Sequence, residues 1–167
     1  MRPVPSPAGA ETRVREGVVV WLRPFDELAV GDSYVSGGRT VTEADIVRFA
    51  ALTGEMSPVS GNPGLYTEGT TAGRIGAPAL LALTYSIGLV PNGRVAALRR
   101  VHDLRLLAPI AAGDTIRVRC EILRLVPWTE DYGLVTGGWT IVNQEEAVAM
   151  TVELEAVWQR AAPGGLP

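Results

Sequence analysis

Apolar and polar residues alternate in a strand-like pattern over most of the second half of the chain. Residues 115–125 and 147–158 alternate most clearly, and residues 132–142 and 95–109 predict two further strands. The positions expected to face inward are Ile116, Val118, Cys120, Ile122, Val148, Met150, Val152, Leu154, Ala156 and Trp158. Turns are expected at Asn143-Gln144 and at residues 109–114. Half-buried alternating strands joined by short turns predict an antiparallel sheet with one face on a core.

Helical periodicity marks two segments of the first half. Thr42 and Asp45 form a capping-box-like start, and Gly54 is a suitable helix stop. The apolar residues between them recur at helical spacing, namely Ile46, Phe49, Ala50 and Leu52. In residues 77–90, Pro78 suits a first helical turn. Leucine, tyrosine and isoleucine side chains surround most of this second helix, so we expect it to be buried on nearly all sides.

The remaining segments complete an α+β domain. Residues 16–24 predict a short strand, residues 25–32 a lead-in ending in a turn, and residues 33–41 an extended segment. Residues 55–76 form a long polar loop, and loops of this length are usually functional or disordered. Residues 1–15 and 161–167 are expected to be flexible tails. We therefore expect one domain over residues 16–160, an antiparallel sheet wrapped around one buried helix.

Composition removes several functional classes. The net charge of −3 argues against nucleic-acid binding, which needs a basic face. The single cysteine, Cys120, and the single histidine, His102, argue against a disulfide framework and a zinc site. No apolar run is long enough for a membrane span, and the N-terminus lacks the apolar stretch of a signal peptide. We expect a cytoplasmic protein without a metal.

Five segments, in order, resemble the MaoC-like enoyl-thioester hydratases and dehydratases of the hotdog fold. They are residues 25–32, 37–54, 72–89, 104–122 and 137–158, so the resemblance spans roughly residues 24–160. It implies a curled antiparallel sheet around a long central helix. It also implies a dimer whose sheets join edge to edge, with acyl-thioester tunnels at the interface. Its substrates would be enoyl or 3-hydroxyacyl groups on coenzyme A or an acyl carrier protein, with no metal or redox cofactor.

The catalytic loop of this family departs from its usual pattern here. Hydrating members carry D-x-N-P-x-H after the first helix, and this chain has EMSPVS at residues 55–60. Glu55 stands at the Asp position, Ser57 at the Asn position and Ser60 at the His position. A carboxylate in an apolar tunnel has a raised pKa and can serve as acid or base near neutrality. A serine hydroxyl does not titrate there and can only orient water or substrate.

The start of the central helix departs as well. The family opens this helix with an A-H-G-like pattern whose glycine N–H donates to the thioester oxygen. This chain has Ala77 at the His position and Pro78 at the Gly position. Proline has no N–H, and losing one oxyanion donor typically costs about a hundred- to a thousandfold in rate. A one-residue slip would let Ala77 or Ala79 supply the donor instead.

These residues favour a diverged acyl-thioester hydratase or dehydratase of the lyase class. Glu55 would be the acid or base, and Ser57 and Ser60 would orient water or substrate. The expected substrate contacts are Asn62, Tyr66, Ile75, Ala77 and Pro78. One alternative is a cyclase or conjugate-addition enzyme on a polyketide-like substrate. A second is a non-catalytic acyl-binding subunit of a hotdog heterodimer, although a homodimer is the first expectation.

Several conspicuous side chains have simpler interpretations. His102 is expected at a surface or interface, and Tyr85 in the core with a partner for its hydroxyl. Arg74 would fix the loop through backbone carbonyls. Arg117, Arg119 and Arg124 would form a solvated strand face, from which they could also meet a coenzyme or carrier phosphate.

Overall fold

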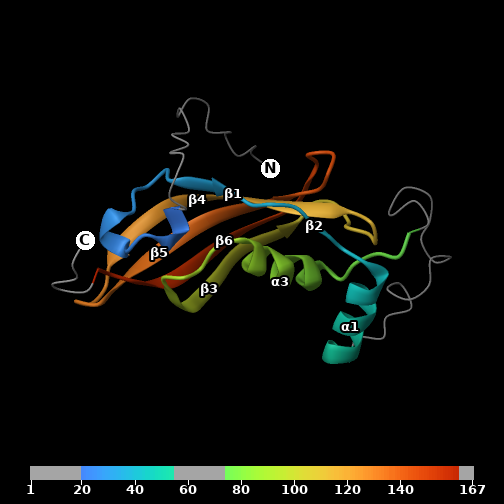
Figure 1. Cartoon of the computed structure of the whole chain (residues 1–167), viewed down its shortest axis with the longest axis horizontal. Coiled ribbons are helices and arrows are strands. Elements are labelled where there is room, and N and C mark those ends of the chain that lie inside the picture. The colour runs from blue at the N-terminus through green and yellow to red at the C-terminus, as the bar shows by residue number, and fades with distance from the viewer. Residues whose placement is uncertain (1–19, 55–73, 162–167) are drawn as a thin grey trace.

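The computed structural model describes residues 20–54 and 74–161, and these form a long curled sheet packed against one helix (Figure 1). The strands are β1 (Ser33–Val35), β2 (Arg39–Thr40), β3 (Val95–Leu106), β4 (Thr115–Pro127), β5 (Tyr132–Val142) and β6 (Val148–Gln159). Their order is β1-β4-β5-β6-β3, with β2 also paired to β4, and every pairing is antiparallel. The predicted α+β architecture is confirmed.

The core lies between the inner face of this sheet and helix α3 (Ala79–Leu89). The predicted inward residues of β4, from Ile116 to Ile122, are all buried, and the arginines and glutamate between them are exposed. In β6 the prediction holds from Met150 to Trp158, whereas Val148 at the strand start is exposed. Alternation therefore identified the buried face of the sheet correctly in both strands.

Helix α1 (Glu43–Thr53) has both ends where the sequence predicts them. The Thr42 hydroxyl accepts from the Asp45 N–H, and the Asp45 carboxylate accepts from the Thr42 N–H, which completes the capping box. Gly54 ends the helix in the left-handed conformation, at φ 71°. Among the apolar residues of α1, only Ile46 is fully buried, and Leu52 is 83% exposed. The helix contacts the domain along a narrow stripe.

Two further predictions are wrong in part. Residues Val20–Leu22 form a short 3-10 helix, η1, within the segment 16–24 that the sequence predicts as a strand. This turn directs Trp21 into the core against Trp139 and Trp158. Helix α3 is not buried on all sides, because the sheet covers only one side of it. Leu80 is 56% exposed, and Thr84 and Gly88 extend the exposed stripe at the four-residue spacing of a helix face.

Candidate functional site

The start of α3 is held beside the turn that follows β3. The Ala77 N–H donates to the Ile110 carbonyl at 2.8 Å, and the Ala112 N–H donates to the Ile75 carbonyl at 2.8 Å. Gly76 pairs with Ala111 between these two bonds. The chain thus enters α3 as one strand of a short antiparallel ladder. This ladder fixes the first turn of the helix relative to the sheet.

A cavity of about 350 Å³ lies at this end of α3. Its lining combines Ala77 and Ala79 with residues 106–110 and with Ala149 and Met150 of β6. Of the predicted substrate contacts, Ala77 lines it. Ile75 is in the ladder and Pro78 is the residue before the helix, and neither contributes to the lining. The described lining carries no charged side chain, which suits an apolar acyl group.

The backbone donors at this cavity differ from those first expected. The Ala77 N–H is already used by Ile110, so it cannot serve as the replacement oxyanion donor. Pro78 is the N-cap of α3 rather than part of its first turn, and it has no N–H. The Ala79 N–H is the first of the helix and makes no hydrogen bond to the described residues. The N-terminal N–H groups of a helix attract negative charge, so Ala79 is the donor available to a ligand oxygen.

Asp114 anchors the approach to α3. Its carboxylate is buried and accepts from the Ala111 N–H at 2.9 Å, from Arg74 at 2.6 Å and from Gln144 at 3.1 Å. Burial opposes ionisation of this group, but the three donors outweigh it and hold the pKa of Asp114 below its ordinary value. Arg74 also donates to the Ala112 carbonyl at 3.3 Å. The predicted role of Arg74, fixing the loop through a backbone carbonyl, is confirmed and extended by this ion pair.

A second polar cluster joins α1 to α3. Arg39 lies between Tyr85 on α3 and Asp45 on α1. Its guanidinium is 3.7 Å from the centre of the tyrosine ring and 3.8 Å from the Asp45 carboxylate. The Thr42 N–H and the Tyr85 hydroxyl lower the pKa of Asp45 to about 2. Burial and the Asp45 carboxylate raise the pKa of Tyr85. Both groups therefore keep one protonation state around neutral pH, and the cluster is a structural link rather than an acid–base pair.

The other predicted site residues lie outside the described part of the chain. They are Glu55, Ser57, Ser60, Asn62 and Tyr66. Their roles stay predictions. His102, which the structure does describe, is half-buried on β3, the strand at one end of the sheet, and pairs there with Glu153 of β6. No hydrogen bond from its imidazole to the described residues is found. Among residues 20–54 and 74–161, no group of three or more potential ligand residues could hold a metal ion, and no helix could span a membrane.

Sequence reasoning missed one cluster that has the character of a site. Trp21, Trp139 and Trp158 meet at the far end of α3 and line a second cavity. Alternation alone could have placed Trp139 and Trp158 on the same face of neighbouring strands. The contribution of Trp21 could not be found in this way, because its segment was predicted as a strand.

Comparisons with known proteins agree with the sequence resemblance. The chain is 35% identical over 105 residues to the MaoC protein of Klebsiella aerogenes; the match covers 60% of this chain and 30% of that protein, so the chain spans about a third of its length. No family model matches the chain.

Solved structures share its fold over most of its length. The monoamine oxidase regulatory protein of Archaeoglobus fulgidus superposes with a TM-score of 0.74 at 27% identity, over 83% of this chain and 95% of that one. The (R)-hydratase PhaJ1 of Pseudomonas aeruginosa gives 0.66 at 22% identity, over 86% and 93%. A double-hotdog protein of Mycobacterium tuberculosis gives 0.64 at 21% identity, over 90% of this chain and 48% of that one. The curled antiparallel sheet around α3 and these superpositions identify the fold as the hotdog fold. In sequence the chain is similar to the MaoC protein over the matched residues.

Proposed function

We propose that this chain is a diverged acyl-thioester hydratase or dehydratase that uses Glu55 as its acid–base group. The observation that carries the proposal is the cavity of about 350 Å³ beside the Ala79 N–H, which has no hydrogen-bond partner within residues 20–54 and 74–161. An acyl chain suits the apolar lining, and the thioester oxygen suits the first N–H of α3. Similarity to a MaoC protein and an (R)-hydratase supports the same reaction class.

The reaction would need one proton transfer at each of two substrate atoms. In dehydration, the Glu55 carboxylate takes the proton from the α carbon, and negative charge develops on the thioester oxygen beside Ala79. The carboxylic acid so formed then gives its proton to the leaving 3-hydroxyl, and water and the enoyl thioester are released. Hydration is the reverse. Ser57 and Ser60 would orient the water, because neither hydroxyl titrates near neutral pH.

The first test follows hydration of short and medium trans-2-enoyl-coenzyme A by the purified chain. Wild-type turnover should fall by about a hundred- to ten-thousandfold in Glu55→Gln, the usual range for a lost general acid or base. Ser60→Ala should lower turnover far less. Equal turnover in wild type and Glu55→Gln would remove Glu55 from the mechanism.

The role of Ala79 has a separate test. Ala79→Pro deletes the N–H at the first helical position, where proline is well tolerated. Its rate should fall about a hundred- to a thousandfold with unchanged thermal stability. Pro78→Ala, which adds a second donor one residue earlier, is the matched variant and should not lower the rate. A fully active Ala79→Pro enzyme would mean that the oxyanion is bound elsewhere.

A homodimer is part of this proposal. β3 is the last strand of the sheet, and Leu98, Val101 and Leu106 on it are exposed. An open apolar edge of this kind is a usual site for pairing with another strand. Sedimentation of the pure chain should therefore give twice the monomer mass.

A second candidate, a non-catalytic acyl-binding subunit, is favoured by one observation: no titratable side chain of the described residues lines the cavity. A pure chain that binds an acyl thioester without turnover, and gains activity only with a partner that carries the intact D-x-N-P-x-H pattern, would support it. The cyclase or conjugate-addition alternative needs the same carboxylate. It would be indicated by turnover of a polyketide-like substrate but not of simple enoyl thioesters.

A further inference from the structure

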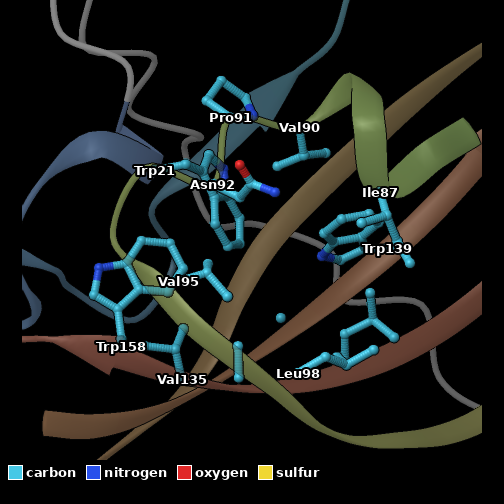
Figure 2. A pocket seen from close by; sticks show the side chains of 13 residues that line it. Trp21, Ile87, Val90, Pro91, Asn92, Val95, Leu98, Val135, Trp139 and Trp158 are labelled. Atoms are coloured by element: carbon cyan, nitrogen blue, oxygen red, sulfur yellow. The ribbon is translucent and has the colours of Figure 1, made fainter.

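A second cavity, of about 70 Å³, lies at the opposite end of α3 from the proposed reaction site (Figure 2). Ile87 in the last turn of α3 and Val90 directly after the helix cover it, and β5 and β6 form its floor. The floor is hollow because Gly137 and Ala156 stand where neighbouring inward positions carry larger side chains. Small residues on two adjacent strands therefore create this space.

Rigid aromatic side chains form its walls. The Trp21 and Trp139 rings meet edge to face with centres 6.3 Å apart, and Trp21 and Trp158 lie 5.5 Å apart. The Trp158 indole N–H donates to the Arg23 carbonyl at 2.8 Å, which fixes that ring. All three side chains are buried. Interlocked rings of this size cannot readily collapse into the space beside them.

Two indole N–H groups of the walls have no hydrogen-bond partner among the described residues: that of Trp21, whose nitrogen is buried, and that of Trp139, which faces the cavity. Trp139 is only 8% exposed, and its indole N–H makes no hydrogen bond to the described residues. Its nitrogen lies 3.1 Å from the point where a Cβ on Gly137 would stand, so it faces the volume that Gly137 leaves open. Burying a donor without an acceptor is unfavourable. A ligand oxygen at this position would supply the acceptor.

We propose that this cavity binds a compact apolar group that carries one neutral oxygen, such as a ketone or ether. Its volume is roughly half that of an engineered cavity of about 150 Å³ that binds benzene, so it takes about four heavy atoms. A charged group is excluded, because no charged side chain lines the cavity to pair with it. Leu98 and Asn92, which are exposed, border the cavity. A ligand larger than the cavity would therefore extend into solvent on that side.

This ligand site goes beyond the proposed reaction and does not depend on it. The eleven residues of α3 place roughly 16 Å between the two ends of the helix, at 1.5 Å per residue. The two cavities share no lining residue. If Glu55 proves not to be catalytic, the proposed ligand site between the tryptophans is unaffected. If no ligand binds between the tryptophans, the proposed role of Glu55 is unaffected.

The experiment is an NMR titration of the four indole N–H signals with acetone, which has four heavy atoms. The shape-matched control ligand is 2-methylpropene, which replaces the ketone oxygen by a methylene group. The ketone should move the Trp139 proton downfield in a saturable way, because a new hydrogen bond forms. The alkene should occupy the cavity without that downfield shift. Trp128, which is exposed and outside the cavity, supplies the internal reference signal.

Two variants make the test specific. Gly137→Ala places a methyl group against Trp139 and Trp21, and should weaken ketone binding at least tenfold. Trp139→Phe keeps an aromatic wall but removes the donor, and should weaken it about two- to tenfold. Trp128→Phe should leave binding unchanged. The proposal would be overturned if the Trp139 signal shifted no more than that of Trp128, or if its shift were the same in Gly137→Ala. Binding of the alkene alone would overturn the requirement for a ligand oxygen.

Discussion

Replacing Asp114 by asparagine should destabilise the protein in a manner that depends on pH. The Asp114 side chain is buried and accepts hydrogen bonds from a backbone N–H, from Arg74 and from Gln144. Asparagine has nearly the same shape, but it loses the negative charge and turns one acceptor into a donor. That donor would face groups that themselves donate. The loss therefore tests the electrostatic role of the carboxylate rather than its packing.

The expected magnitude at pH 7 is about 2 kcal/mol of unfolding free energy. Hydrogen bonds to charged groups contribute about 1.5–3 kcal/mol each, against about 0.5–1.5 for neutral ones. The Arg74 side chain is partly exposed, so solvent weakens its share of the ion pair. The Ala111 N–H is the donor on which most of the loss depends, because it is buried together with the carboxylate.

The pH dependence follows from the direction of the pKa shift. The pKa of Asp114 is lowered by folding from its ordinary value of 3.8. The carboxylate therefore stabilises the folded state fully above about pH 5, and its contribution is lost as the pH falls through the folded-state pKa. Wild type and Asp114→Asn should then differ by about 2 kcal/mol at pH 7, and the difference should shrink as the pH falls below the ordinary carboxyl pKa.

Urea unfolding at pH 7, 5, 3 and 2 measures this difference. Asp131→Asn is the control, because the Asp131 side chain is exposed and makes no hydrogen bond to the described residues; it should change stability by less than about 0.5 kcal/mol. A loss of 2 kcal/mol that stayed constant down to pH 2 would refute the electrostatic reasoning and point to packing.

Three further predictions use other parts of the fold. Gly133→Ala should lower the free energy of unfolding by about 1–3 kcal/mol, because the new methyl would overlap the Phe25 ring. Gly88→Ala, on the open face of α3, should raise it by about 0.5–1 kcal/mol. Urea unfolding measures both, and equal effects of the two variants would contradict this reasoning. Thr42→Ala should cost about 1 kcal/mol and speed hydrogen exchange in the first turn of α1, and unchanged exchange would rule out the cap. Burial raises the pKa of Cys120 to about 12, so a thiol reagent at pH 8 should label it only at the rate of unfolding.

The parts of this fold that could be predicted from sequence are those set by local rules. The two ends of α1 follow from Thr42, Asp45 and Gly54, because capping is decided within four residues. Burial in β4 follows from period-two alternation. Leu52 shows the limit of such rules: its helical spacing is correct, but nothing described covers that face of α1. Trp21 shows another limit, because its partners come from β5 and β6, far along the chain.

The site shows the same division. The missing N–H of Pro78 could be read from the sequence, since it is a property of the residue itself. The state of the Ala77 N–H could not, because its acceptor, Ile110, is brought to it by the fold. The sequence leaves open two replacement donors, the N–H groups of Ala77 and Ala79. The long-range hydrogen bond to Ile110 removes the first of them. Of these two, Ala79 keeps its donor beside the cavity.

Residues 55–73 are joined at both ends to elements that are fixed to the same helix. They begin after Gly54, and α1 is linked to the middle of α3 through Asp45 and Tyr85. They end at Arg74, which Asp114 binds beside the start of α3. The described cavity lining supplies apolar surface and a backbone donor but no acid or base. If the cavity is a reaction site, its proton-transferring group comes from outside its described lining. Residues 55–73 lie between the two elements fixed to α3, and Glu55 directly follows Gly54, the residue that ends α1. Loss of turnover in Glu55→Gln with retained acyl binding would therefore identify a catalytic segment, whereas an inactive wild type that still binds an acyl thioester would identify a binding subunit.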